Sequence, residues 1–271
     1  MIEQTTISIA ALIATIITVW ALLKIKKHGL AYISCRKNHM AHGCCHDLRI
    51  DETSTYSEEE LSLYSIGNLH VGKFGGTLNT LGTGIDAAER TSMLQQDFGI
   101  DNRDRAIKKL KWLSTAPSQL TFHFAYEAYL KGKEGENWLR NSKELADSKE
   151  LCDKCIMQMK KIKRQYKEIM NAGIADSEYE LGLLGVIAWD AGQLNFLSRA
   201  CMEQGYINKD ECMICLDAAY KMSHEAFSNW KDFAHSYALG FALYGDATCM
   251  AYMAEQLLNA KQSPWSYIKW E

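Results

Sequence analysis

Proline is scarce in this chain, and basic residues are not in excess. Only two of its 271 residues are proline, Pro117 and Pro264, and 30 Lys and Arg stand against 33 Asp and Glu, for a formal net charge of −3. Because proline breaks helices, its scarcity permits long ones. Proteins that bind nucleic acid usually carry a basic excess. The composition therefore favours an all-α body and excludes nucleic acid as an expected partner.

Several sequence signatures of catalysis are also absent. The chain has no His-Glu-x-x-His zinc motif, no Gly-x-Ser-x-Gly nucleophile elbow and no Gly-x-Gly-x-x-Gly dinucleotide pattern. The glycine-rich segment 67–86 contains GKFGGT, which lacks the residue order of a phosphate-binding P-loop. Since glycine disfavours helices, we predict a loop or small hairpin near 67–86.

One long apolar run lies near the N-terminus. Residues 7–23, ISIAALIATIITVWALL, carry no charge, and the basic sequence KIKKHG follows directly. A helix needs roughly 20 apolar residues to cross the hydrocarbon core of a bilayer. After a short tail at 1–6, we therefore predict a transmembrane anchor at 7–26, with the lipid bilayer as its partner.

Basic residues flank only the C-terminal side of this run. Lys24, Lys26 and Lys27 follow it, whereas its N-terminal side carries Glu3 and no Lys or Arg. A cleaved signal peptide would have its positive charges before the apolar run. The positive-inside rule instead predicts a single-pass protein with its N-terminus outside and its C-terminal domain in the cytoplasm.

The segment after the anchor, 27–50, is rich in cysteine and histidine. Six side chains of the types that bind zinc fall within twelve positions: Cys35, His39, His42, Cys44, Cys45 and His46. Tetrahedral zinc takes four such ligands, but the spacing matches no standard zinc finger. Cysteine beside a membrane helix is also a target for acylation. A zinc site, an acylated segment and a plain linker all stay open, and no cofactor is predicted unless this cluster holds zinc.

Residues 51–271 have the pattern of one multi-helix domain. Apolar residues recur at helical spacing, and the lysines between them are expected to face water. We predict helices at 87–97, 102–113, 118–130 and 137–171, with a buried helix within 185–211. Ser57, Asn208 and Ser228 are the predicted caps of further helices. The pairs Cys152/Cys155 and Cys212/Cys215 lie in helical sequence, so we interpret them as packing residues rather than zinc ligands.

The buried helix contains polar residues among apolar ones, in the sequence GVIAWDAGQLNFLSRACMEQGYINKDE. Asp190 shares a helix face with Val186, Leu194 and Leu197, so its carboxylate points into the core or a crevice in it. An ionised carboxylate out of water costs several kcal/mol unless hydrogen-bond donors meet it. Asp190 must therefore have partners.

Three interpretations of this polar set stay open. It is a buried network that holds helices in register, or it lines a site for a small polar ligand or a partner's segment. The residues concerned are Trp189, Asp190, Gln193, Asn195, Arg199 and Tyr237. In the third interpretation, Asp190 with His224 or His235 forms an acid/base pair.

The same part of the chain resembles the bacterial domain-of-unknown-function family numbered 1266. The resemblance covers roughly 94–245 and rests on LQQDFGIDNRDRAIKKLKWL and on the block from VIAWDAGQLNFLSRA to SYALGFALYG. It implies a helical fold and a bacterial setting, with no established reaction. Phe98 stands where the family usually has Trp, Gln193 where it usually has Arg, and Phe241 where an Arg often follows the glycine. If those arginines form an anion site, this chain has lost much of it.

The combined prediction is a helical domain anchored in a bacterial inner membrane and facing the cytoplasm. It would serve as a binding, regulatory or structural module with a protein partner. The alternative is an enzyme, a hydrolase or an effector-like toxin, that uses Asp190 as acid or base in a helical pocket.

Overall fold

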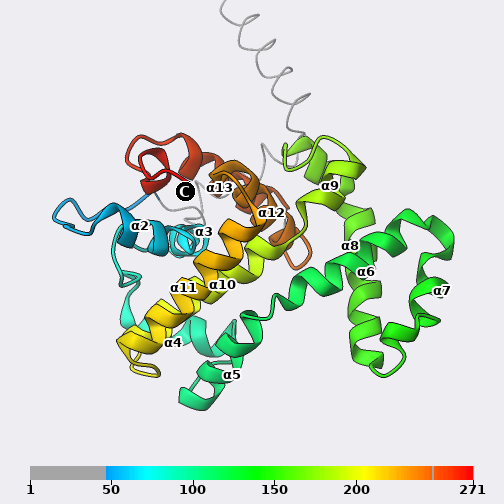
Figure 1. Ribbon diagram of the computed structural model, residues 1–271, viewed down its shortest axis with the longest axis horizontal. Helices are drawn as coiled ribbons and strands as arrows, with labels where there is room; N and C mark the ends of the chain where they lie inside the picture. Colours follow the sequence, from blue (N-terminus) through cyan, green and yellow to red (C-terminus); the bar gives the residue numbers. More distant parts are fainter. Residues whose placement is uncertain (1–46, 246, 271) are drawn as a thin grey trace, which may run out of the picture.

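The computed structural model describes residues 47–245 and 247–270, and the regular structure of this part is helical throughout (Figure 1). The one β-type contact found in it is an isolated bridge between Arg49 and Thr77. The α-helices are α2 (Glu58–Ser65), α3 (Asn68–Lys73), α4 (Ala87–Gln96), α5 (Arg103–Leu113), α6 (Pro117–Leu130), α7 (Gly135–Arg140), α8 (Lys149–Asn171), α9 (Glu178–Leu184), α10 (Ile187–Glu203), α11 (Lys209–Ala226), α12 (Trp230–Ala242) and α13 (Ala247–Asn259). Short 3-10 turns lie at η1 (Gly132–Glu134), η2 (Lys143–Leu145) and η3 (Pro264–Ser266). The all-α prediction is confirmed.

Helix α10 is the centre of the fold. It contacts α3, α4, α5, α6, α11 and α12, and every residue from Ala188 to Cys201 is buried. A helix that is covered on all sides has no face left for water. The predicted buried helix is confirmed, and each of its polar side chains needs a partner inside the protein. Helices α6, α7 and α8 form a second group to one side of it (Figure 1).

Two predictions about where helices begin and end are wrong. The predicted helix at 137–171 is split, because α7 ends at Arg140 and α8 begins at Lys149 with Ser148 as its N-cap. Asn and Ser side chains in this interval compete for backbone hydrogen bonds, which outweighs the helix-forming Lys and Glu around them. At the start of α12 the N-cap is Asn229, whose side chain accepts from Asp232 N at 2.8 Å, rather than the predicted Ser228.

The glycine-rich segment 67–86 contains the helix α3, where only a loop or hairpin was predicted. This helix is buried and contacts α10 and α13. A Cβ at Gly72 would lie 2.8 Å from the sulfur of Met253, so glycine is what allows the two helices to come this close. Tertiary packing overrides the low helix propensity of the segment. The rest of the segment is loop.

The predicted caps Ser57 and Asn208 are confirmed, each in a capping box with the glutamate three residues on. Burial raises the pKa of the thiols of Cys155, Cys212 and Cys215 to about 11, as expected of packing residues. No helix within the described ranges is long and apolar enough to span a membrane. The predicted anchor at 7–26 and all six members of the Cys/His cluster lie outside the residues that the structure describes.

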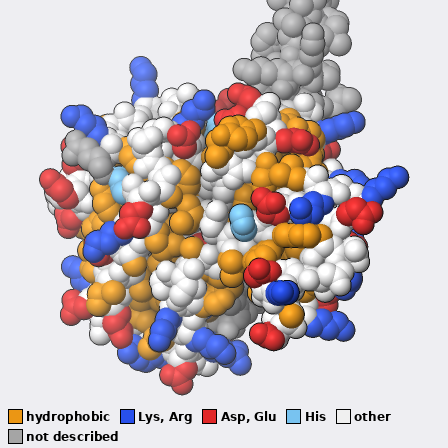
Figure 2. Space-filling model, turned by 45° about the vertical axis from the view of Figure 1, so that its right-hand side comes forward, with side chains coloured by type: hydrophobic (Ala, Val, Ile, Leu, Met, Phe, Trp, Pro, Cys, Tyr) orange, Lys and Arg blue, Asp and Glu red, His pale blue; other side chains and the backbone are white. Residues whose placement is uncertain are grey.

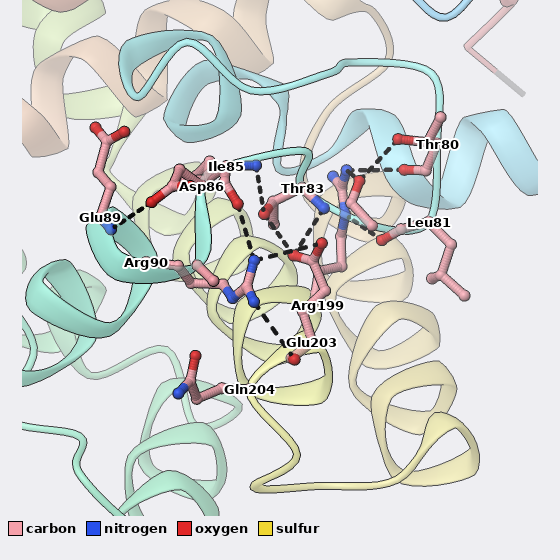
Figure 3. Close-up of polar contacts among 12 residues, drawn as sticks. Thr80, Leu81, Thr83, Ile85, Asp86, Glu89, Arg90, Arg199, Glu203 and Gln204 are labelled. Atoms are coloured by element: carbon pink, nitrogen blue, oxygen red, sulfur yellow. Dashed lines mark hydrogen bonds and ion pairs between the residues drawn. The ribbon is translucent and has the colours of Figure 1, made fainter.

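Arg199 fastens the long loop after α3 to the central helix (Figure 3). Its guanidinium is completely buried and donates to four backbone carbonyls: Leu81 at 3.0 Å, Tyr64 at 3.0 Å, Thr80 at 2.8 Å and Gly82 at 3.1 Å. One turn on, Glu203 accepts from the backbone N–H and the hydroxyl of Thr83. Burial lowers the pKa of Arg199 to about 10, so the group remains charged at neutral pH. Its partners are main-chain dipoles rather than a carboxylate.

Replacing Arg199 with lysine should destabilise the fold strongly. A single ammonium cannot reach Tyr64 and the 80–82 loop together, so buried carbonyls lose their donors at about 1–3 kcal/mol each. We expect Arg199→Lys to lower the free energy of unfolding by at least about 3 kcal/mol in urea titrations. Arg105→Lys is the matched control, because Arg105 is exposed and bound only to Asp101, and it should change nothing measurable. A loss below about 1 kcal/mol for Arg199→Lys would show that the carbonyls do not depend on this side chain.

Candidate functional site

The six predicted site residues are all buried, but they do not form one site. Asn195 and Arg199 point toward α2 and the loop that follows α3. The amide of Asn195 donates to the carbonyl of Leu63 at 2.6 Å, next to the carbonyl of Tyr64 that Arg199 holds. Tyr237 packs its ring against Trp189, with ring centroids 5.3 Å apart. These residues position helices, as the network interpretation expects.

Asp190 caps a neighbouring helix. Its Oδ2 atom accepts from Ser118 N at 2.7 Å, at the first turn of α6. Helix α6 has no side-chain cap of its own, since it begins at Pro117 after Ala116 in the left-handed conformation, φ 48°. A carboxylate at a helix N-terminus meets both free N–H groups and the positive end of the helix dipole. Asp190 thus supplies from α10 the cap that α6 lacks.

A side chain of α6 in turn caps the start of α10. Gln119 Oε1 accepts from Val186 N at 2.7 Å, where α10 begins without a side-chain cap of its own. Ser236 of α12 accepts from Ala188 N at 3.4 Å and donates to the carbonyl of Gly185 at 3.1 Å. The two helix starts are therefore fixed to each other by reciprocal side-chain hydrogen bonds.

The charge of Asp190 is only partly compensated. Burial raises the pKa of its carboxyl to about 6, against the opposing effects of the hydrogen bonds at Ser118 and of the nearby Lys154 charge. The Oδ1 atom is buried and has no hydrogen-bond partner among the residues that the structure describes. His224 stacks on Trp270, with centroids 4.3 Å apart, and His235 borders a separate cavity between α12, α13 and the turn that follows α8. Neither histidine lines the cleft beside Asp190.

A cleft of about 620 Å³ lies against this part of α10. Its walls combine aromatic rings, lysines, a few neutral polar groups and one acidic residue, Asp97. The lining residues are His70, Lys73, Phe74, Gln96, Asp97, Phe98, Lys109, Trp112, Ser118, Lys154, Trp189, Gln193, Phe241, Tyr244 and Gly245. Two predicted site residues, Trp189 and Gln193, therefore belong to it, and Asp190 lies directly behind Ser118.

Three lysines from three different helices meet in this cleft, each against aromatic rings. Lys73 Nζ lies 5.0 Å from the ring centroids of Phe74 and of Phe241. The Nζ atoms of Lys109 and Lys154 lie 4.3 and 5.5 Å from the centroid of Trp112. None of the three forms an ion pair with a carboxylate of the described chain. On the face shown in Figure 2, by contrast, charges of both signs are interspersed.

The pKa of Lys109 reflects its burial and nearby charges of both signs. Burial is the main cause that lowers the pKa of its ammonium, and the charge of Lys154 lowers it further, while Asp190 opposes both. An anion in the cleft would relieve the repulsion between the two ammonium groups.

The cleft wall also contains neutral polar groups. Gln193 lines the cleft and is only 6% exposed. His70 is buried with its Nδ1 atom unpartnered, and burial lowers the pKa of its imidazole well below the ordinary value, so the ring is neutral. A buried polar group without a partner is a place where a ligand atom gains a hydrogen bond.

The lysines of this site were missed in the sequence. Those in 102–113 and 136–167 were expected on solvated faces, whereas Lys109 and Lys154 are half-buried in the cleft. One signal was available: Lys109 and Trp112 are three residues apart and so share a helix face. The three positions that depart from the family pattern, Phe98, Gln193 and Phe241, all line this cleft. Its positive charge therefore rests on lysine alone.

Asp190→Asn should flatten the pH dependence of stability. The folded-state pKa of about 6 exceeds the ordinary value of 3.8, so the folded chain binds this proton more tightly than the unfolded chain. The tighter proton binding stabilises the folded state by roughly 2 to 3 kcal/mol. This stabilisation is full below pH 4 and is lost as the pH rises to about 6. Urea titrations from pH 4 to 7.5 should show the wild type losing this amount relative to the variant. If the free energy of unfolding changed with pH in the same way for both proteins, the raised pKa of Asp190 would be ruled out.

The comparisons with known proteins agree with the resemblance seen in the sequence. A family model described as "Protein of unknown function (DUF1266)" matches residues 93–270, which include the whole cleft except the α3 end. No curated protein and no solved structure matches the chain. Because the matched region is more than half of the 271 residues, the chain belongs to the DUF1266 family.

Proposed function

We propose that this chain is a binding module that holds a small anionic ligand in the cleft beside α10. One observation carries the proposal: Lys73, Lys109 and Lys154 line one cleft from α3, α5 and α8, and none of them forms an ion pair with a carboxylate of the described chain. Three ammonium groups in one half-buried cleft repel one another, and a bound anion removes that cost. A volume of about 620 Å³ is typical of small-ligand sites.

The aromatic rings under the lysines support this role. A ring face attracts an ammonium group and keeps the long lysine side chain in one place. Asp190 and Gln119 fix the first turn of α6, and with it Ser118, in the cleft wall. The site is therefore largely formed before a ligand binds, which reduces the entropy lost on binding.

Removing one cleft lysine should weaken anion binding. Each charge-assisted contact to a phosphate oxygen contributes about 1.5 to 3 kcal/mol, so Lys109→Gln and Lys154→Gln should each lower the affinity for pyrophosphate by roughly tenfold or more. Isothermal titration of the full chain at constant salt measures this. Lys108→Gln is the matched control on the same helix, because Lys108 is exposed and does not line the cleft. Equal losses for Lys108→Gln and Lys109→Gln, or no binding by the wild type, would refute the site.

A catalytic role of Asp190 is the second candidate. It is favoured by the pKa near 6 and by the unpartnered Oδ1 atom, since a general acid or base works best with a pKa near the operating pH. The binding module and the enzyme differ in one measurement. Asp190→Asn should leave pyrophosphate affinity within about threefold in the binding module, because the capping hydrogen bond from Ser118 persists. In an enzyme, the same variant would bind its substrate and fail to turn it over.

We also propose that residues 7–26 anchor the module in a bacterial inner membrane as a single pass, with the helical domain in the cytoplasm. The uncharged run 7–23 and the basic residues that follow it support this orientation. Deleting residues 2–26 should move the protein from the carbonate-washed membrane fraction to the soluble fraction. Fusions of alkaline phosphatase to the C-terminus should be inactive. An active fusion would contradict the proposed orientation. A truncated chain that stays in the membrane fraction would contradict the proposal that residues 7–26 are the anchor.

A further inference from the structure

Two exposed aromatic rings lie beside the cleft lysines. Trp112 is 42% exposed and Tyr244 is 44% exposed, and both line the cleft. The other tryptophans of the described ranges are buried or half-buried. Lys154 Nζ lies 5.5 Å from the ring centroid of Trp112 and 6.0 Å from that of Tyr244. Both rings thus keep apolar surface exposed beside one ammonium group, and Tyr244 also stacks on Trp189 with centroids 5.8 Å apart. A ligand that covered the exposed surface would remove it from water, which is favourable.

The charge beside these rings fits a dianion better than a carboxylate. Lys109 and Lys154 both lie within 6 Å of the Trp112 ring centroid, so two positive charges share one small region. A monoanion would neutralise one of them, whereas a phosphate monoester carries close to two negative charges at neutral pH. Lysine binds phosphate as a point charge and needs no fixed geometry of two parallel hydrogen bonds.

From this placement we infer that the ligand is an aromatic phosphate ester, and that nucleotides are its biological class. The inference rests on the proposed anion-binding function and adds the chemistry of the ligand. Its phosphate is held by Lys109 and Lys154, and its planar ring stacks on Trp112 or Tyr244. The amide of Gln193, which also lines the cleft, is a neutral group able to bind the polar edge of a base. The glycine-rich segment plays no part as a phosphate loop.

The test compares ligands that carry both the phosphate and the aromatic ring with ligands that lack one of the two. Isothermal titration of the full chain would use the four nucleoside 5′-monophosphates, ribose 5-phosphate, adenosine and benzoate. Stacking of a base on an aromatic side chain is worth about five- to 150-fold in affinity. We expect at least one nucleoside monophosphate to bind roughly tenfold or more tightly than ribose 5-phosphate. Adenosine and benzoate should bind more weakly than that nucleotide.

Trp112 supplies the matched variants. Trp112→Ala should lower nucleotide affinity roughly tenfold while changing ribose 5-phosphate affinity by less than about threefold, and Trp112→Phe should keep most of the affinity. Trp138→Ala is the control, because Trp138 carries Lys131 at 5.0 Å from its ring centroid but does not line the cleft. Circular dichroism confirms that each variant is folded.

Three outcomes would overturn the inference. If ribose 5-phosphate binds as tightly as every nucleotide, the cleft recognises phosphate alone, and the anion site stands without the aromatic part. If benzoate binds more tightly than all four nucleotides, the ligand is an aromatic monoanion. If no anion binds, the proposed function fails together with the inference.

Discussion

The structure depends on one constraint: α10 is buried along most of its length, so the charged and amide groups that it turns toward the core take hydrogen-bond partners from other parts of the chain. Arg199 takes its four acceptors from α2 and the loop after α3, and Asn195 takes one from Leu63. Asp190 takes its donor from the start of α6. Main-chain groups are the partners in each case. A buried polar group without them would cost the protein several kcal/mol, so these contacts fix where the surrounding elements lie.

The cleft is a consequence of the same constraint. Because Asp190 and Gln119 fix the starts of α6 and α10 to each other, Ser118 is held in the cleft wall next to Trp189 and Gln193. Helices α5 and α8 then bring Lys109 and Lys154 to the same place, and α3 brings Lys73. The polar set of α10 thus divides between two tasks. Arg199, Asn195 and Asp190 hold helices, while Gln193 and Trp189 face the cleft.

Much of the fold could be predicted from local sequence signals. The buried character of α10, the capping boxes at Ser57 and Asn208 and the family membership all lie in short stretches of residues. Local signals gave wrong predictions where contacts between distant parts of the chain determine the structure. Helix α3 forms in a glycine-rich segment because Gly72 meets Met253 of α13. The break between α7 and α8 was hidden by helix-forming Lys and Glu on both sides of it.

The site was predictable only in part, for the same reason. Trp189, Asp190 and Gln193 are conspicuous because polar residues stand out in an apolar helix. The lysines are not conspicuous, since a lysine on an amphipathic helix is normally solvated. Lys73 and Lys154 lie 81 positions apart in the chain, and no spacing rule relates them. Only the packing of α3, α5 and α8 around α10 brings them together.

Residue-resolved lysine labelling tests most directly whether these three lysines form one anion site. The full chain would be acetylated briefly, with and without pyrophosphate at constant ionic strength, and each lysine would be quantified by mass spectrometry. An anion site predicts that pyrophosphate protects Lys73, Lys109 and Lys154 while labelling of the exposed Lys108 and Lys163 stays the same. Equal labelling of the three cleft lysines with and without the anion would contradict it.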